Sequence, residues 1–275
     1  MANEVANTTK FELAVTRSGI DETMLSEYND ELSDLGDGGI NYRSIKLPFG
    51  KVKQFTIESD NPDDPDIAKE LTGVIVFTHQ MNVMYEEYGS DNKVPICSSW
   101  DAKVGFNTKT NKSCSCDRCP HNQFRDNGSG IIRKECKNSR RIYLMLDGKP
   151  DLYMLTVPPT SLKDVRMQLN RIMSSCGKPY TSMVLSFSLV GAVSKGGQDF
   201  SKIAIRKAGD LAPEQAETVR QMREELKESY KSVIITSDDY YTQEPEQTSH
   251  APEPTTDANG FVSIPDGIPE ELPFN

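Results

Sequence analysis

Short runs of apolar and β-branched residues alternate with clusters of Gly, Pro, Asn and Asp along most of the chain. Runs of this kind, bounded by turn-forming residues, are typical of β-strands. They cover residues 43–49, 52–57, 71–78, 181–193 and 200–206. Residues 142–146 and 152–157 flank Asp147-Gly148, which predicts a hairpin around an Asp-Gly turn.

Two segments carry apolar residues at helical spacing instead. After Pro158-Pro159, Ser161 and Asp164 resemble a capping box, and the face that follows holds Leu162, Val165, Leu169, Ile172 and Met173. The second segment follows Asp210, with Pro213 in its first turn, and its apolar face holds Ala216, Val219, Met222, Leu226 and Tyr230. Strands first, one helix among the later strands and one helix after them predict a mainly β, α+β or barrel-like domain.

Charge is distributed unevenly along the 275 residues, whose formal net charge is −10. Residues 1–40 carry nine acidic and two basic side chains, and residues 237–275 carry nine acidic and none basic. Residues 41–236 are therefore basic, at +6, and residues 97–141 alone are also at +6. A basic middle with acidic ends suggests a nucleic-acid-binding body, although a purely solubilising tail is the alternative.

The two acidic ends differ in apolar content. Residues 237–275 contain six prolines and few apolar residues, which predicts a disordered tail. In residues 1–40, Phe11, Leu13 and Val15 alternate and favour an edge strand, so this end is expected to be partly ordered. We expect three parts: residues 1–40, a core over 41–236, and the tail.

Cysteines give the sharpest motif, because five of the six lie between residues 97 and 136. Cys116 and Cys119 form a C-x2-C knuckle, flanked at similar distances by Cys97 and Cys136. Four thiolates in this arrangement fit a tetrahedral zinc ion, which leaves no open position and would be structural. The sequence therefore predicts a zinc module over residues 97–141 within the core.

Other roles for the cysteines remain open. The polar loop around the knuckle disfavours a thioredoxin-like redox site, and the absence of an apolar secretory segment disfavours disulfides. Unbound thiols are a further alternative. Within a zinc site, Cys114 and His121 are alternative ligands, whereas Cys176 at a helix end is expected to be an ordinary packed thiol.

No catalytic motif was found. The chain has no H-E-x-x-H, phosphate-loop, G-x-S-x-G or zinc-deaminase signature, and only three histidines. We therefore expect no enzymatic activity. No apolar run approaches the roughly 20 residues of a membrane span, and we expect a cytoplasmic protein without membrane contact.

Basic and aromatic residues interleave around the cysteines, as a binder of unpaired strands requires: cations contact the phosphates and rings stack on exposed bases. Core packing is the alternative for each aromatic residue. The predicted contacts are Trp100, Phe106, Arg118, Phe124, Arg125, Arg133, Lys134, Arg140, Arg141 and Tyr143.

A basic β-rich body followed by an acidic, Pro-rich tail with an apolar tip resembles the single-stranded DNA-binding proteins of replication and recombination, and a metal knuckle within the body is similar to those of bacteriophages. The resemblance implies an oligonucleotide-binding (OB) barrel, cooperative coating of single strands as a homo-oligomer or filament, and recruitment of replication and recombination proteins by the tail. The tip residues that carry this resemblance are Ile268, Glu270, Glu271, Leu272 and Phe274.

The functional expectation is thus a single-stranded DNA-binding protein with structural Zn²⁺. Two other functions stay open: a zinc-stabilised adaptor for protein partners, and a metal-dependent nuclease with scattered acidic ligands.

Overall fold

The fold was analysed in a computed structural model that describes residues 11–14, six positions between 23 and 34, and residues 42–85, 94–126, 132–194 and 197–232. All of these residues fall within one compact unit, residues 1–242. The predicted tail, with its tip from Ile268 to Phe274, lies outside the described residues.

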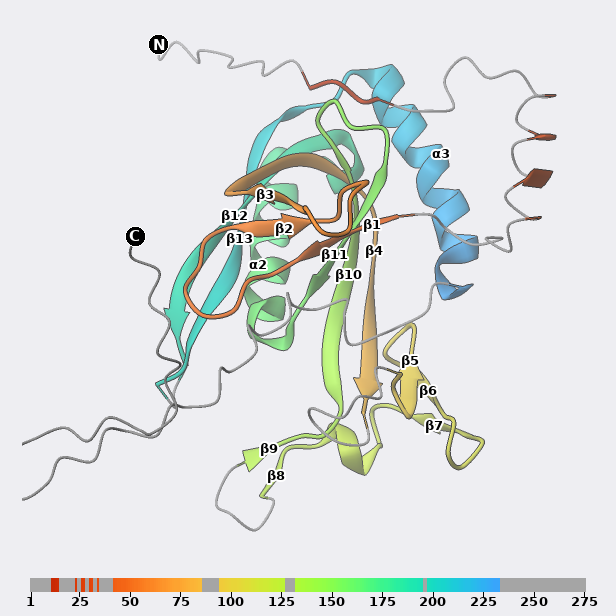
Figure 1. Cartoon of the computed structure of the whole chain (residues 1–275), viewed down its shortest axis with the longest axis vertical. Helices are drawn as coiled ribbons and strands as arrows, with labels where there is room; N and C mark the ends of the chain where they lie inside the picture. The colour runs from red at the N-terminus through yellow and green to blue at the C-terminus, as the bar shows by residue number, and fades with distance from the viewer. Residues whose placement is uncertain are drawn as a thin grey trace, which may run out of the picture. The chain divides into compact units, whose positions relative to one another are not determined.

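Strands make up most of the described chain (Figure 1). They are β1 (Arg43–Lys46), β2 (Phe55–Ile57), β3 (Asp66–Ala68), β4 (Glu70–Met84), β5 (Cys97–Ser99), β6 (Val104–Asn107), β7 (Lys112–Ser115), β8 (Arg125–Asp126), β9 (Ile132–Arg133), β10 (Lys137–Leu146), β11 (Leu152–Val157), β12 (Met183–Val193) and β13 (Asp199–Asp210). The helices are α2 (Pro159–Cys176) and α3 (Pro213–Ser229), with 3-10 turns η1 (Pro120–Asn122), η2 (Tyr180–Ser182) and η3 (Tyr230–Ser232). This mixed α+β, mainly β content confirms the predicted class.

Eleven strands form one sheet, ordered β3-β2-β1-β11-β10-β4-β5-β6-β7, and β4 also pairs with β12, which pairs with β13. The strand pairs are antiparallel except for β1 and β11. The hairpin predicted around Asp147-Gly148 is confirmed as β10 and β11.

The sheet is open, so the expected closed barrel is wrong. The 15-residue β4 pairs with β12 through Glu70–Gly73 and with β5 through Asn82–Met84, which makes the sheet fork instead of closing. β13 meets the loop between β1 and β2 through side chains: Ser201 Oγ donates to the backbone oxygens of Gly50 (3.0 Å) and Val52 (2.7 Å).

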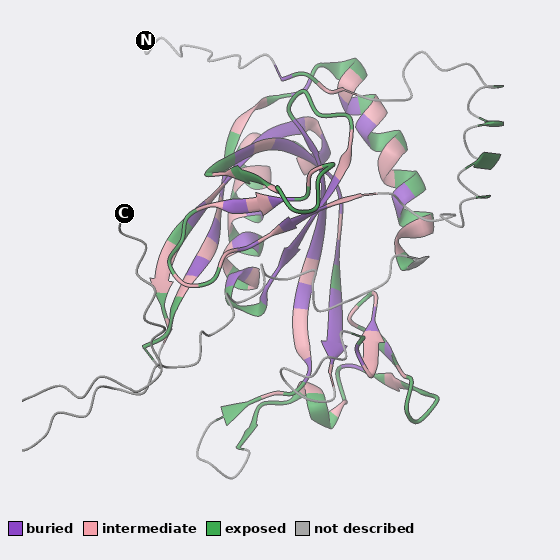
Figure 2. Cartoon of the chain, in the orientation of Figure 1, coloured by how far each residue is buried: buried purple, intermediate pink, exposed green. Residues whose placement is uncertain are grey.

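Each face of the sheet is covered by one helix. On one face, α2 packs Val165 and Leu169 against Ile142 and Leu144 of β10 and residues of neighbouring strands. On the other face, α3 contributes to a second cluster that contains Tyr143 and Met145. The alternation along β10 follows the two-residue period of a strand, and both faces are buried (Figure 2). These two clusters and their elements are called the sheet body below.

Both predicted helices are present, but the predicted capping box is wrong. The N-cap of α2 is Pro158, which has no side-chain cap, and Ser161 lies inside the first turn. Its buried hydroxyl accepts a hydrogen bond from the amide of Ile203 on β13 at 3.3 Å. The helix ends at Gly177, whose φ of 62° is readily adopted by glycine.

Residues 11–14 of the acidic N-terminal segment contact the sheet body without forming a strand. Phe11 is buried in the α3-side cluster, and Leu13 packs against it. Glu12 accepts a hydrogen bond from the Gly148 amide (2.9 Å), and its own amide donates to Asp147 (2.8 Å). These contacts tie the segment to the β10–β11 turn.

Candidate metal centre and nucleic-acid interface

The cysteine module, residues 97–136, lies between the C-terminal end of β4 and the N-terminal end of β10 (Figure 1). β5 pairs with the end of β4, and β6 and β7 extend the same sheet in strands of three to four residues. Where the module joins the body, the small apolar cluster consists of Met81 and Val83 with Tyr85 and Trp100. The module thus has little apolar core among the described residues.

Five cysteines gather in this module. Cys97 begins β5, Cys114 lies on β7, Cys116 and Cys119 sit in the turn that follows, and Cys136 precedes β10. None of them forms a disulfide, and Cys116 and Cys136 are buried.

Gly105 on β6 marks the centre of the cluster. A Cβ atom at this glycine would lie 3.3 Å from Sγ of Cys97 and 3.5 Å from Sγ of both Cys114 and Cys116. Any larger residue would enter the space between the sulfurs. Sequence reasoning missed this glycine because only the pairing of β6 with β7 sets it opposite Cys114.

Burial and neighbouring sulfurs raise the pKa of three of these thiols. Burial, with Cys114 beside it, raises the pKa of Cys97 to about 12, and burial, with Cys116 beside it, raises the pKa of Cys136 to about 12. Burial also raises the pKa of Cys114, to which neighbouring Cys119 contributes. Thiolates this close repel one another, and a bound divalent cation would reverse that penalty.

The donor set fits zinc, which prefers thiolate ligands and tetrahedral coordination. Within the described residues, no group of three or more His, Cys, Asp and Glu side chains is already set at metal-binding spacing. Sulfurs from three of these cysteines lie around the position of Gly105, and zinc binding by thiols would release their protons. Cys97, Cys116, Cys119 and Cys136 remain the predicted ligands, with Cys114 as a fifth sulfur among them.

The alternative ligand His121 and the remaining cysteine, Cys176, lie in different surroundings. His121 Nδ1 lies 2.6 Å from the Glu135 carboxylate, and both side chains are exposed. Cys176, at the end of α2, is partly buried against the α2-side core, as expected for an ordinary packed thiol.

Asn122 ties the knuckle to β10 and was not singled out from the sequence. Its side-chain amide donates to the backbone oxygen of Cys116 at 2.9 Å. Its oxygen accepts from Lys134 Nζ and from Asn138 Nδ2, both at 3.1 Å. This short-range polar network holds the module where apolar contacts are few.

The β8–β9 ribbon brings two predicted cations together. Arg125 and Arg133 lie directly opposite each other across this two-stranded ribbon, and both are exposed. Like charges in this position repel each other. Within the described chain neither arginine has a carboxylate partner at ion-pair distance, and the same holds for exposed Arg118 in the knuckle.

Two predicted aromatic residues of the module are exposed, and one of them, Phe124, lies beside these cations. Phe124, just before β8, is 69% exposed, and Lys134 Nζ lies 5.3 Å from its ring centroid. Phe106 on β6 is 44% exposed. Both rings have the surface that stacking on a base requires.

The remaining predicted contacts are less accessible. Arg141 and Tyr143 are each 0% exposed, so neither side chain reaches the surface, and we leave both out of the interface. Trp100 is partly buried: the Arg141 guanidinium lies 5.5 Å from its ring, and its backbone oxygen accepts a hydrogen bond from His79 Nδ1 at 2.9 Å. Arg140 is half-buried. The alternation of β10 and the cover provided by Trp100 explain this burial.

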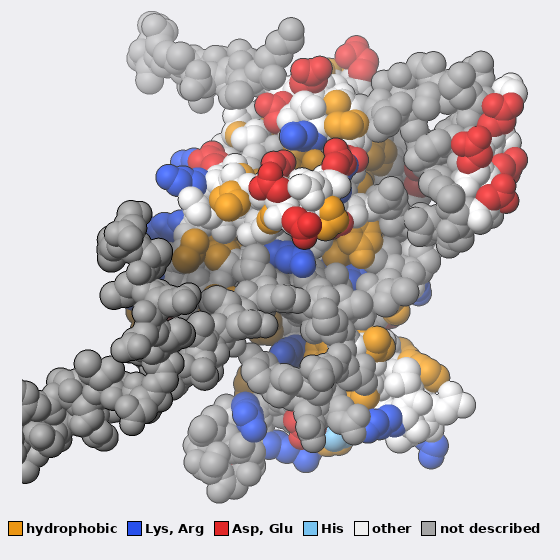
Figure 3. Space-filling model, viewed as in Figure 1, with side chains coloured by type: hydrophobic (Ala, Val, Ile, Leu, Met, Phe, Trp, Pro, Cys, Tyr) orange, Lys and Arg blue, Asp and Glu red, His pale blue; other side chains and the backbone are white. Residues whose placement is uncertain are grey.

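In the view of Figure 3, Lys and Arg side chains lie at the end that carries the cysteine module and also on the sheet body, whereas acidic side chains gather away from the module. The module end of this face is therefore mainly basic.

Comparison of the chain with protein-family models, with curated proteins and with solved structures found no match in any of the three. None of the described helices is long and apolar enough to cross a membrane. The function is therefore argued from the residues of the site.

Proposed function

We propose that this protein is a non-enzymatic single-stranded DNA-binding protein whose cysteine module is held by structural zinc. The observation that carries the proposal is the β8–β9 ribbon, where opposed Arg125 and Arg133 stand beside exposed Phe124. Phosphates would relieve the repulsion between the two arginines, and unpaired bases would stack on the ring. The bases of a duplex are already stacked on one another, so fewer of them can stack on the Phe124 ring.

Zinc would supply folding energy rather than chemistry in this proposal, because four thiolates fill its coordination sphere. Thiolate ligands persist in a reducing compartment, which is consistent with a cytoplasmic protein. Coating of single strands during replication or recombination, self-association on the strand, and recruitment of partners by the tail belong to the same proposal, and they rest on the resemblance stated above.

Anisotropy titration of a labelled single-stranded oligonucleotide, and of its duplex, at two salt concentrations tests the proposal. We expect salt-sensitive binding that favours the single strand. Replacing both Arg125 and Arg133 with Ala should weaken binding about tenfold or more and reduce the salt slope by about 1.4, for two lost phosphate contacts. Phe124→Ala should weaken binding by about 1–3 kcal/mol and leave the salt slope unchanged.

Arg206→Ala provides a matched control, because Arg206 is exposed on β13 and already paired with Glu70 at 2.7 Å. The Arg206→Ala variant should bind the single strand with an affinity close to that of the wild type. Equal weakening by the control and by the ribbon variant would show that only net charge matters. No binding of either nucleic acid would refute the proposal.

A protein-binding adaptor is the second candidate, and the exposed apolar residues Val104 (58%) and Ile132 (69%) of the module favour it. An adaptor would bind a partner with little dependence on salt and would ignore oligonucleotides. The same titration therefore separates the two functions.

A further inference from the structure

The three short strands β5, β6 and β7 form a small sheet whose two faces differ. Directly opposed residues on neighbouring strands share a face, and successive residues along a strand alternate between faces. Cys97, Gly105 and Cys114 lie on one face, so a metal held by the sulfurs would occupy that side. The other face, called the Phe106 face below, holds Ser98, Val104, Phe106, Ser113 and Ser115.

Apolar side chains on the Phe106 face are exposed to solvent. Phe106 is 44% exposed and Val104 is 58% exposed, whereas Gly105 between them is buried. This alternation follows the two-residue period of a strand and shows that only the cysteine side of β6 is covered. An exposed aromatic ring on a sheet is a surface on which an unpaired base can stack.

Ser113 lies directly opposite Phe106 on the neighbouring strand β7. The Cys116 amide donates to the backbone oxygen of Lys103 at 2.8 Å, which makes these two residues a hydrogen-bonded pair. Hydrogen-bonded and non-hydrogen-bonded pairs alternate along antiparallel strands, so Phe106 and Ser113 form a non-hydrogen-bonded pair, whose side chains lie closest together. The Ser113 hydroxyl therefore stands beside the ring, where it can bond to the edge of a stacked base.

Positive charge flanks the Phe106 face. Lys103 precedes β6 and Lys112 begins β7, and both are exposed. Neither lysine has a carboxylate at ion-pair distance among the described residues. The face itself offers two apolar side chains, whereas a stable protein interface buries about 800 Å² on each partner. A single strand, with a charged backbone and flat bases, suits this surface better than a protein does.

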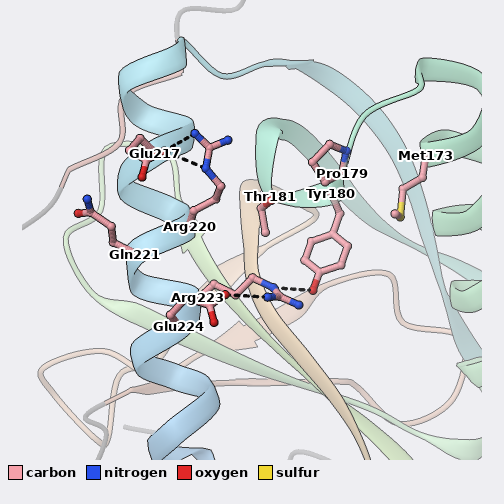
Figure 4. A pocket seen from close by; sticks show the side chains of 9 residues that line it. All are labelled: Met173, Pro179, Tyr180, Thr181, Glu217, Arg220, Gln221, Arg223 and Glu224. Carbon is pink, nitrogen blue, oxygen red and sulfur yellow. Dashed lines mark hydrogen bonds and ion pairs between the residues drawn. The ribbon is translucent and has the colours of Figure 1, made fainter.

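The cavity of the sheet body lacks such free cations. It has a volume of about 550 Å³ and lies between α3 and the connection from α2 to β12 (Figure 4). Both of its arginines already have partners: Arg220 pairs with Glu217, and Arg223 pairs with Glu224 at 3.1 Å. The charges that line this cavity are therefore balanced.

We infer that the Phe106 face is a second base-binding site, where Phe106 stacks on an unpaired base and the Ser113 hydroxyl bonds to the edge of that base. The inference rests on the proposed function and extends it, because the Phe106 face and the β8–β9 ribbon belong to different sheets. A single strand that contacts both would present one base to Phe106 and another to Phe124.

Anisotropy titration with two labelled probes tests the inference: a single-stranded oligonucleotide, and a strand of the same length made of abasic sites, which keeps the phosphates and lacks the bases. Phe106→Ala should weaken binding of the oligonucleotide by about tenfold and leave its salt slope unchanged. Binding of the abasic strand should be unaffected. Phe106→Trp keeps a flat ring and should restore most of the affinity, whereas Phe106→Leu should lose as much as Phe106→Ala.

Two further variants complete the experiment. Ser113→Ala removes one hydroxyl and should weaken oligonucleotide binding by about threefold. Val190→Ala is the matched control, because Val190 is an apolar side chain on β12 of the sheet body with 52% exposure, and it should bind like the wild type. Equal weakening of oligonucleotide and abasic strand by Phe106→Ala would show that the ring supports the module instead of a base, and would overturn the inference.

The two proposals fail in different ways. Unchanged oligonucleotide binding by Phe106→Ala, together with weak binding by the Arg125/Arg133 variant, would refute the Phe106 face as a base-binding site and leave the proposed function intact. Absence of binding by the wild-type protein would refute both.

Discussion

The sheet body and the cysteine module are built from different interactions. In the body, long strands bury large apolar side chains on both faces, and Leu144 and Phe187 are completely buried. In the module, strands of two to four residues surround a centre made of Gly105 and cysteine sulfurs. Apolar burial accounts for the stability of the body, whereas the module has few apolar contacts, is held by hydrogen bonds such as those of Asn122, and in the proposed function is stabilised by zinc.

The two regions also differ in how their exposed cations are arranged. On the body, Lys51, Lys202 and Arg206 pair with carboxylates at 2.7–3.0 Å, although exposed Arg166 and Arg171 of α2 have no ion pair among the described residues. In the module, Arg118, Arg125 and Arg133 have no such partner among the described residues either, and Arg125 lies directly opposite Arg133. The interface is placed on the module because these two facing cations stand beside exposed Phe124.

Removing one cysteine sulfur should have the largest effect, and it should affect the module without affecting the sheet body. For Cys116→Ser we expect zinc content to fall from about one ion per chain to near zero. Structural zinc in small modules contributes about 10–16 kcal/mol of apparent binding energy, so amide protection over residues 97–136 should disappear while that of α2 and α3 persists. Metal analysis combined with hydrogen exchange measures both effects.

Cys176→Ser is the control for this experiment, because its thiol packs against the body and should not affect zinc. A zinc-free protein whose module exchanges as slowly as that of the metal-loaded protein would contradict a metal-dependent module.

Truncating a core side chain should instead affect the sheet body. Leu144→Ala, at a position with 0% exposure, should lower the free energy of unfolding of the body by about 2–5 kcal/mol and leave zinc content unchanged. Phe106→Ala, at a 44% exposed position in the module, should change it by about 0.5 kcal/mol or less. Urea unfolding followed by tyrosine fluorescence and circular dichroism gives both values. Similar losses of unfolding free energy in the two variants would argue against a difference in how the sheet body and the module are stabilised.

An effect that depends on pH is expected at the junction of the regions, where His79 contacts Trp100. Burial lowers the pKa of His79 to about 4, so the folded protein keeps this ring neutral at pH values where the unfolded chain binds a proton. Its contribution to stability is complete above about pH 6.5 and is lost as the pH falls toward 4, by roughly 2 kcal/mol between pH 6.5 and 5. His79→Gln should flatten the pH dependence of unfolding by this amount, and identical pH profiles would show that His79 does not titrate with folding.

Several features of the fold followed from local patterns. The β10–β11 hairpin was predicted from Asp147-Gly148, and α3 from Pro213 and the spacing of Val219 and Leu226. The gathering of the cysteines was also foreseen, because a knuckle with flanking cysteines can come together by short-range chain folding.

Other features depended on partners far away in the sequence. The sequence suggested a strand over 71–78, but β4 runs to Met84 because β10 and β5 pair with its second half. Arg141 and Tyr143 read as surface contacts, yet the packing of α3 and Trp100 buries the face of β10 on which they lie. A barrel was expected, and the fork at β4 left the sheet open.

Residue type and spacing along the chain determined which chemistry this protein can offer: thiols close enough to share a metal, and a basic middle between acidic ends. Tertiary structure alone decided which of these groups can act. It set Arg125 opposite Arg133, buried Arg141, and left Arg140 half-buried. The physical reason is that residue spacing acts over a few residues, whereas the exposure and repulsion of a charge depend on strands and helices that meet across the whole fold.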